Sequence, residues 1–343
     1  MSWTPTPEQL RSSAAPLQLG ASAQRGAVRE GEPSRDLKPM SEHRSNEPEN
    51  TESLFSRVRR GVFRFFLRSL PENRMGDALF SLFQFVRFHK RLPNNSMSYN
   101  DVLHRIKTSD DILDPLRVFV SDKELMKLYV SAVAGDKYVV PTLGVIKSRA
   151  AVDSYEFPMQ CAIKATHTSG CVIIRKQGEP VDRALIKSWF DFNYYRLNRE
   201  ANYKTLKPKV IIEPLLFGSW NIQDYKIFCL NGKPKLIQVD VDRYVGHKRK
   251  YFDASWNEQN FSIKYPRTDK VIPRPENLDE MLDVAAKLSE NFWFVRVDLY
   301  SNGDETFVGE ITHCADNADG RFSPPSAEQQ LSSYLFDGVT RAG

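Results

Sequence analysis

Two alternating segments near the end of the chain, 292–300 and 305–312, constrain the fold more than any other feature. Apolar and polar side chains change places there with a period of two, which is typical of β-strands with one polar face. Asn302 and Gly303 lie between the segments and favour a tight turn. The sequence therefore predicts an antiparallel hairpin.

The polar side chains of this hairpin are Arg296 and Asp298 on the first strand and Glu310 and Thr312 on the second. Whether they share a face depends on the loop, because a shift of one residue turns every side chain to the opposite face. A two-residue turn would separate Asp298 from Glu310. A three-residue loop over 302–304 would bring all four side chains together, and we expect this loop.

Two neighbouring carboxylates repel each other unless they share a cation. Mg²⁺ takes one or two carboxylates together with phosphate oxygens and water, so Asp298 and Glu310 are candidate ligands, with Thr312 beside them. Arg296 would then stabilise an anionic intermediate. The alternative interpretation is a solvated sheet face with a salt bridge.

The rest of the chain mixes helices and strands, mostly in antiparallel pairs, so the fold class is α+β. We expect helices over 122–134, 184–192 and 278–290, and strands over 159–165, 171–176, 209–216, 224–230 and 234–240. Residues 1–52 hold six prolines and seven serines and predict a disordered tail. We expect a helical region over 53–120, a catalytic region over 121–320 and a C-terminal segment over 321–343.

A lysine and a small polar turn join two of these strands. Lys164 ends the first strand, and the turn consists of Thr166, His167, Thr168, Ser169 and Gly170. Such a turn can close its N–H groups over a phosphate. No Gly-Lys-Ser/Thr follows, so it is not a Walker A loop, and an ordinary hairpin with an exposed lysine remains the alternative.

An apolar strand stops at Glu213. The carbonyl of Pro214 and the N–H of Leu216 could then pair with an adenine ring, although a plain buried strand explains the same pattern. Lys226 opens another strand and is a further candidate for a phosphate contact. A basic loop follows, formed by Arg243, His247, Lys248 and Arg249, which could receive an acidic substrate.

The segment 54–91 carries nine Lys or Arg residues and two acids. Its first part predicts an amphipathic helix with a basic stripe of Arg57, Arg60, Arg64 and Arg68. A second helix, rich in Phe over 80–88, should end in His89, Lys90 and Arg91, just before Pro93. The apolar stripes of this helical pair either pack on the catalytic region or attach the protein to anionic lipid as a peripheral membrane contact.

The bulk composition excludes several classes of protein. The 48 basic and 43 acidic residues are too balanced to imply a nucleic acid partner, and the four cysteines form no CxxC pair. The first thirty residues lack the apolar core of a signal peptide, and no apolar run is long enough for a transmembrane helix. We expect a cytoplasmic protein, with the inner face of the membrane as an alternative site.

The order of these segments resembles the ATP-grasp superfamily, and within it the TupA-like branch, which is associated with teichuronopeptide and other cell-envelope polysaccharides. The resemblance runs from Asp122 to Glu310. The matching blocks include Val140 to Gly144, the Lys164 turn, Lys207 to Glu213, Asp224 to Lys226, Asn231 to Lys235, Gln238 to Asp240, Arg243 with His247 and Arg249, and Tyr251 to Asp253 before Trp256.

The resemblance implies an ATP-grasp fold, in which two α+β lobes clasp ATP, and it implies roles for individual residues. Lys123 and Lys164 would contact ATP phosphates, Thr166 to Gly170 would form the phosphate loop, and Glu213 to Leu216 the adenine hinge. Asp298 and Glu310 would hold magnesium, and Arg296 would stabilise the intermediate. Thr312 occupies the position where many members have an asparagine ligand, Thr168 stands where the branch tends to have glycine, and the segment after Glu310 lacks the expected proline.

The implied activity is a magnesium-dependent ligation in which ATP phosphorylates a carboxylate and an amine, or less often another nucleophile, attacks the acyl phosphate. The expected substrate is an acidic small molecule or glycan, such as a uronic acid or amino acid of a cell-envelope polysaccharide. The two alternatives are a phosphotransferase on the same fold and a non-catalytic protein of glycan assembly or membrane attachment.

Overall fold

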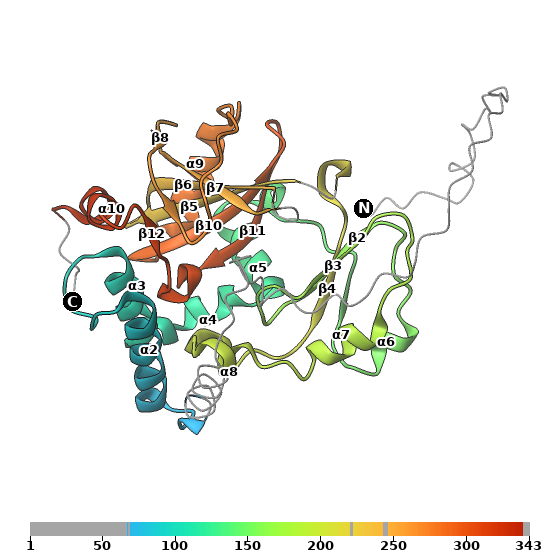
Figure 1. Ribbon diagram of the computed structural model, residues 1–343. Helices are drawn as coiled ribbons and strands as arrows, with labels where there is room; N and C mark the ends of the chain where they lie inside the picture. Colours follow the sequence, from blue (N-terminus) through green and yellow to red (C-terminus); the bar gives the residue numbers. More distant parts are fainter. Residues whose placement is uncertain (1–66, 68, 220–221, 243–245, 339–343) are drawn as a thin grey trace, which may run out of the picture. The chain divides into compact units, whose positions relative to one another are not determined.

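The computed structural model describes residues 67, 69–219, 222–242 and 246–338 (Figure 1). The predicted tail over 1–52 lies outside these residues. The same is true of the predicted basic stripe of Arg57, Arg60, Arg64 and Arg68, and of Arg243 in the predicted basic loop.

The larger sheet has six strands in the order β11-β10-β5-β6-β7-β8, and all neighbouring strands are antiparallel. Its bounds are β5 (Gln223–Leu230), β6 (Lys233–Val241), β7 (Lys248–Asp253), β8 (Glu258–Gln259), β10 (Phe294–Ser301) and β11 (Thr306–Thr312). Apolar side chains cover one face of this sheet and part of the other. Helices α5 (Lys123–Val133) and α9 (Leu278–Ser289) pack on one face, and α3 (Tyr99–Thr108) and α10 (Ala327–Phe336) pack on the other.

The smaller sheet has four strands in the order β1-β4-β2-β3, again all antiparallel. Its bounds are β1 (Gly144–Ile146), β2 (Cys161–Ala165), β3 (Val172–Arg175) and β4 (Val210–Glu213). Helices α6 (Ala151–Ser154) and α7 (Arg183–Trp189) complete its apolar core. The predicted strand over 209–216 is therefore shorter than expected, because Pro214 has no N–H with which to continue the ladder.

The remaining helices, strands and turns connect and flank the two sheets. The α-helices are α2 (Arg74–His89), α4 (Pro115–Ser121) and α8 (Tyr194–Asn198), and β9 (Ser262–Ile263) pairs with β12 (Phe322–Ser323). The 3-10 turns are η3 (Asp110–Leu113), η4 (Asp136–Tyr138), η5 (Ala201–Tyr203), η6 (Leu216–Gly218) and η7 (Ala315–Ala318). The mixture of helices and antiparallel sheets confirms the predicted α+β class.

Local sequence sets the helix ends near the sheets. Asp122 caps α5, since its carboxylate accepts hydrogen bonds from the N–H groups of Glu124 and Leu125 at 2.9 and 3.2 Å. Lys123 is therefore the first residue of that helix. Helix α2 ends at His89, two residues before the predicted end at Arg91, because Lys90 adopts a left-handed conformation.

The hairpin of β10 and β11 differs from the expected one in its connection. Four residues, 302–305, join the strands instead of three. Asp298 nevertheless lies opposite Glu310, because the register shifts between Asp298 and Leu299. Leu299 pairs with Val308, so Gly309 is the extra residue of a β-bulge.

Helix α2 packs against the catalytic region. Phe80 and Phe85 are buried, and Asp77 lies 3.0 Å from the Arg199 guanidinium in an ion pair that is also largely buried. The Nε2 atom of His89 lies 2.8 Å from the carbonyl oxygen of Ala318. These contacts favour packing over lipid attachment for the second of the two predicted helices.

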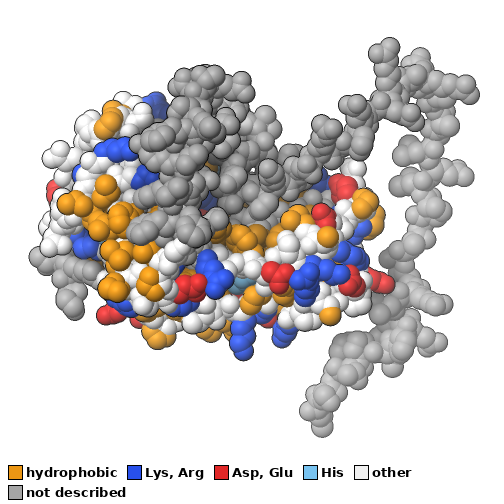
Figure 2. Space-filling model, turned by 60° about the horizontal axis from the view of Figure 1, so that its bottom comes forward, with side chains coloured by type: hydrophobic (Ala, Val, Ile, Leu, Met, Phe, Trp, Pro, Cys, Tyr) orange, Lys and Arg blue, Asp and Glu red, His pale blue; other side chains and the backbone are white. Residues whose placement is uncertain are grey.

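The described surface mixes charges of both signs. Figure 2 shows blue basic and red acidic side chains next to one another on the face that it displays. Within the described residues, no helix is both long and apolar enough to span a bilayer.

Candidate active site

The four polar residues of the β10–β11 hairpin share one face of the larger sheet. Asp298 is paired with Glu310 across the hairpin, and Arg296 with Thr312. Arg296 donates through Nε to Asp298 Oδ1 at 2.7 Å, through Nη2 to Asp298 Oδ2 at 2.8 Å, and to the Thr312 hydroxyl at 3.2 Å. The structure thus confirms that these side chains lie together.

Lys226 reaches the same face from the neighbouring strand β5. Its Nζ lies 3.0 Å from Asp298 Oδ2 and 3.8 Å from Asp240 Oδ2, and it also bonds to Asp224. All four side chains are buried. Lys226 is therefore surrounded by three aspartates. Of these, Asp224 and Asp240 entered the sequence prediction only as parts of the blocks that match the family.

The two carboxylates of the hairpin have different electrostatic surroundings. Burial raises the pKa of Asp298 above its ordinary value, even though Arg296 and Lys226 oppose that shift. Burial also acts to raise the pKa of Glu310, but the positive charges of Lys123, Arg296 and Lys226 outweigh it and lower that pKa. Glu310 is thus held in its charged form.

The carboxylate of Glu310 makes no hydrogen bond or ion pair with any residue that the structure describes, whereas both carboxylate oxygens of Asp298 are engaged. A charged carboxylate without a protein partner suits a hard cation. No group of three or more His, Cys, Asp or Glu side chains occurs in the described part of the chain that could hold a metal by itself. The pair of Asp298 and Glu310 therefore fits a magnesium ion only if other oxygens complete its shell.

A second charged group lies on the smaller sheet and on helix α5. Glu213, at the end of β4, accepts from Lys164 at 2.6 Å and from Lys127 at 2.6 Å. Burial acts against the charged form of Glu213, but the two lysines outweigh it and lower its pKa. Lys127 was not among the site residues predicted from the sequence. It follows Lys123 by four residues, a spacing that places both lysines on one face of a helix.

Lys164 also faces the larger sheet, since its Nζ lies 5.5 Å from the centre of the Tyr300 ring on β10. Burial acts to lower its pKa, but the negative charge of Glu213 raises it overall. Lys164 therefore stays charged between the two sheets, as a phosphate contact requires.

The predicted phosphate loop follows β2 and is held to the start of α5. Lys123 Nζ donates to the carbonyl of Thr168 at 2.7 Å, and the Thr166 hydroxyl donates to Asp122 at 3.2 Å. Ser169 and Gly170 are exposed, and Gly170 has a φ of +83°, a conformation that favours glycine. The structure thus brings Lys123 and the loop together.

His167 is oriented differently from its neighbours in this loop. Its ring is buried, and Nε2 lies 3.1 Å from the carbonyl oxygen of Trp189, at the end of α7. The side chain therefore points into the smaller lobe, and only the backbone of His167 remains for a phosphate.

The predicted hinge follows Glu213. Neither the Pro214 carbonyl nor the Leu216 N–H forms a backbone hydrogen bond with a described residue, so both remain available to a base. Leu216 is buried, and the ring of Phe217 lies 5.7 Å from that of Phe307 on β11. This contact links the hinge to the hairpin that carries Asp298 and Glu310.

The predicted basic loop is only partly a surface feature. Arg249 is buried and bonds to Asp240 at 3.0 Å and to Asp316 at 2.9 Å. His247 lies 3.2 Å from Asp240, with Lys248 next in the chain. The expectation that Arg249 belongs to an open basic loop is wrong, because it is part of the buried charge network.

Lys164, the predicted phosphate loop and the predicted hinge of the smaller sheet thus accompany an acidic hairpin on the larger sheet, in the order expected from the sequence. The family model of TupA-like ATP-grasp proteins matches residues 103–336. The chain belongs to the TupA-like ATP-grasp family. Its fold is the ATP-grasp fold, as predicted, and no curated protein sequence matches it.

Several solved ATP-grasp structures are similar to part of the chain. The ATP-grasp ligase PsnB complexed with minimal precursor is 12% identical, with a TM-score of 0.34, over 59% of this chain and 55% of that one. D-alanine–D-alanine ligase from Bacillus anthracis is 14% identical, with a TM-score of 0.35, over 63% of each chain. The Helicobacter pylori ligase is 14% identical, with a TM-score of 0.34, over 65% and 61%. The chain thus spans less than two thirds of these proteins.

Proposed function

We propose that this ATP-grasp protein is a ligase that uses ATP to activate a carboxylate as an acyl phosphate and joins it to an amine or another nucleophile. The observation that carries the proposal is the pairing of Asp298 with Glu310 beside Arg296. A buried acid, a partly buried acid and a guanidinium on one sheet face suit the transfer of a phosphoryl group to an anionic acceptor.

The nucleotide would lie between the two sheets. Pro214 and Leu216 would pair with the adenine through their free backbone groups, and Lys164 with Lys123 would bind phosphate oxygens. Lys127 would hold Glu213 in place when Lys164 turns to the nucleotide, since both lysines now share that carboxylate. His167, Thr168, Ser169 and Gly170 would contribute backbone N–H groups rather than side chains.

Glu310 and Asp298 would hold the magnesium ion, with Thr312 as a weaker third candidate. The ion supplies charge neutralisation at the phosphates when it is bound. Asp298 must release at least one of its bonds to Arg296 and Lys226 for this role. Lys226 can do so without leaving an unpaired charge, because Asp224 remains its partner.

Arg296 would then act on the substrate. A carboxylate oxygen of the acceptor attacks the γ-phosphorus and ADP leaves; the nucleophile then attacks the acyl carbon and phosphate leaves. Arg296 would donate to the oxyanion of either step, since its guanidinium is permanently charged. Lys226 would contribute a second positive charge.

The substrate proposal remains a uronic acid or amino acid of a cell-envelope glycan, in a cytoplasmic reaction. It is supported by the TupA-like family membership. A panel of such carboxylates is therefore the appropriate set of acceptors for an assay.

Hydroxylamine provides the test. If the protein forms acyl phosphates, ATP, Mg²⁺, hydroxylamine and the right carboxylate will give ADP and a hydroxamate. A phosphorylated product that resists hydroxylamine would instead indicate a phosphotransferase. Absence of carboxylate-dependent ADP formation across the panel would favour the non-catalytic alternative.

A further inference from the structure

A buried aspartate ties the predicted phosphate loop to the first turn of α5. Asp122 precedes this helix and is 2% exposed. Its carboxylate accepts from the hydroxyl of Thr166 at 3.2 Å and from Nζ of Lys209 at 3.1 Å, in addition to the two helix N–H groups that it caps. A helix cap needs only the bonds to the helix N–H groups. The contacts with Thr166 and Lys209 therefore point to a second role for Asp122.

Thr166 begins the phosphate loop and is held through its backbone as well as its side chain. It is fully buried. Its N–H donates to the carbonyl of Lys209 at 2.9 Å, and its carbonyl accepts from the N–H of Lys123 at 3.1 Å. Because the hydroxyl of Thr166 donates to Asp122, it is an anchor of the loop and not a free donor for a phosphate.

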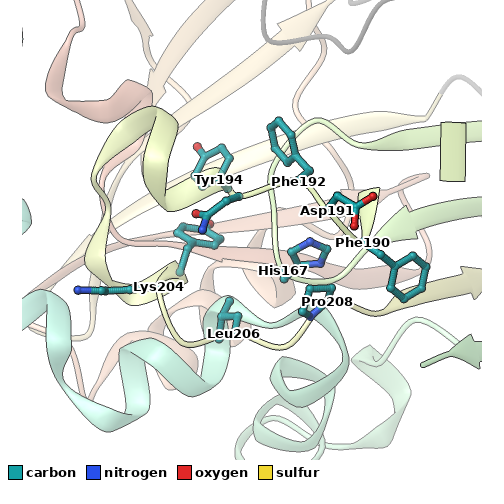
Figure 3. Close-up of a pocket in the computed structure, with 10 residues that line it drawn as sticks. His167, Phe190, Asp191, Phe192, Tyr194, Lys204, Leu206 and Pro208 are labelled. Atoms are coloured by element: carbon teal, nitrogen blue, oxygen red, sulfur yellow. The ribbon is translucent and has the colours of Figure 1, made fainter. Parts of the chain in front are cut away.

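His167 anchors the loop in a second direction. Its ring is buried, and Nε2 lies 3.1 Å from the carbonyl oxygen of Trp189 at the end of α7. Figure 3 shows the ring in the wall of a cavity of about 220 Å³, together with Pro208 and Leu206. Thr166 and His167, which we call the root of the loop, are therefore held by side-chain contacts to two different elements.

Residues 168–170, which we call the tip of the loop, are attached differently. Ser169 and Gly170 are exposed. Within the described residues, one hydrogen bond joins the tip to α5, and in it Lys123 Nζ donates to the carbonyl of Thr168 at 2.7 Å. A phosphate that draws Lys123 away from this carbonyl would release the tip, while the root keeps all of its contacts.

Lys209 supplies the positive charge that a buried carboxylate at Asp122 requires. Its Nζ also pairs with Glu124. Burial acts to lower the pKa of Lys209, but Glu124 and Asp122 outweigh it and raise that pKa overall. Loss of Asp122 would leave Lys209 with Glu124 as its partner, so substitution of Asp122 does not create an unpaired buried cation.

We propose that Asp122 is a positioning residue of the nucleotide site, which fixes the root of the phosphate loop to α5 so that a bound nucleotide moves only the tip. The same helix end carries Lys123, so the loop and a lysine for phosphate would be set in place together. An ordered root reduces the entropy that nucleotide binding has to offset. That the loop receives a nucleotide rests on the function proposed above; the order that Asp122 gives to the loop does not.

Hydrogen–deuterium exchange on the full chain without nucleotide tests this order. Asp122→Ser keeps a good helix cap but is too short to reach Thr166, and Thr166→Val removes the hydroxyl at nearly constant size. Both variants should speed the exchange of a peptide that covers residues 165–171. Asp114→Ser is the matched control, because Asp114 caps α4 with two hydrogen bonds of its own, and it should leave the exchange of this peptide unchanged.

Calorimetry with ATP and Mg²⁺ measures the consequence for the nucleotide site. Asp122→Ser and Thr166→Val should each raise the Kd about fivefold, the factor that corresponds to one ordinary hydrogen bond. The double variant should raise it no further, because both changes break the same contact. Asp122→Asn keeps two polar atoms and should retain most of the affinity. A purely capping role of Asp122 would leave Thr166→Val without effect.

Equal exchange of residues 165–171 in the wild type and in both variants would overturn the proposal. An equally large effect of Asp114→Ser would also overturn it, and so would faster exchange with an unchanged Kd. Melting temperatures show whether Asp122→Ser folds; if it does not, Thr166→Val tests the same contact from the other side. A wild type that binds no ATP would contradict the ligase proposal, whereas the exchange result still decides whether Asp122 orders the loop.

Discussion

Asp298 lies directly opposite Glu310 across the β10–β11 hairpin, although the four-residue connection of this hairpin would place the two side chains on opposite faces. The extra residue of the bulge, Gly309, restores the shared face. A Cβ atom at Gly309 would come within 2.7 Å of the Tyr300 ring. The juxtaposition of the two acids thus depends on a glycine that has no charge of its own.

Substitution of Gly309 should therefore affect both stability and activity. Gly309→Ala forces its new methyl group against Tyr300, and such overpacking typically costs about 1–3 kcal/mol. We expect a lower midpoint of urea unfolding and a loss of magnesium-dependent turnover. Tyr300→Leu in the same chain should recover much of the lost stability by making room. If Gly309→Ala alone leaves the midpoint unchanged, the bulge geometry is wrong.

Lys164→Met should weaken ATP binding while the protein stays folded. Glu213 keeps Lys127 as a partner at 2.6 Å after the change, so no buried charge is left unpaired. A hydrogen bond to a charged group contributes about 1.5–3 kcal/mol, which corresponds to an increase in Kd of about tenfold to 150-fold. Calorimetry measures this, with Lys187→Met on α7 as the matched control. Equal affinity in both variants would exclude Lys164 from the nucleotide site.

Glu200 makes the stability of the protein depend on pH. Burial raises its pKa to about 7, from an ordinary value of 4.5. Between these two values the folded protein binds more protons than the unfolded chain, so this group lowers the free energy of unfolding as the pH rises. Each pKa unit corresponds to about 1.4 kcal/mol.

Glu200→Gln removes the ionisable group and with it this loss of stability at high pH. Relative to the wild type, the variant should be more stable at about pH 8 than at about pH 5. Urea unfolding at the two pH values gives the difference between the variant and the wild type. An advantage of the same size at both pH values would show that Glu200 is not the group responsible.

The sequence predicted seven of the ten strands of the two sheets, because their periodicity and turn residues are local, but it did not predict β1, β7 and β8 as strands. The prediction that the hairpin acids share one face is confirmed, but the predicted three-residue loop is wrong. The loop has four residues, and the β-bulge shifts the register by the one residue that brings Asp298 opposite Glu310. The closeness of Gly309 to the Tyr300 ring, which leaves no room for a Cβ atom, becomes apparent only when the strands pair. The predicted strand over 209–216 extends three residues beyond the end of β4 at Glu213, because Pro214 has no N–H for the ladder.

The candidate site was predictable in its residue types and not in its pairings. Lys226, Asp298 and Arg296 were expected to act on ligands, and the structure shows them bonded to one another. Arg249 was expected in an open loop, but its partner Asp316 lies 67 residues away in the sequence. Such long-range partners leave no periodic signal in a single sequence.

The predicted basic stripe of Arg57, Arg60, Arg64 and Arg68 has its own test. If it binds anionic lipid, changing all four residues to Gln should release the protein from acidic vesicles at an unchanged melting temperature, and added salt should have the same effect. If the stripe packs on the catalytic region, the variant should melt at a lower temperature. Co-sedimentation at two salt concentrations distinguishes these results, and a wild type that binds no vesicles excludes the lipid interpretation.

The magnesium dependence of ATP affinity tests the proposed centre most directly. Glu310 has no ion pair with a described residue, so Glu310→Gln should change the free energy of unfolding little. Asp298→Asn should lower that free energy, because Arg296 loses its charged partner. Calorimetric titration with ATP, with and without Mg²⁺, should show that magnesium strengthens binding to the wild type and has little effect on Glu310→Gln. If magnesium strengthens ATP binding equally in the wild type and in Glu310→Gln, the proposed active site is wrong.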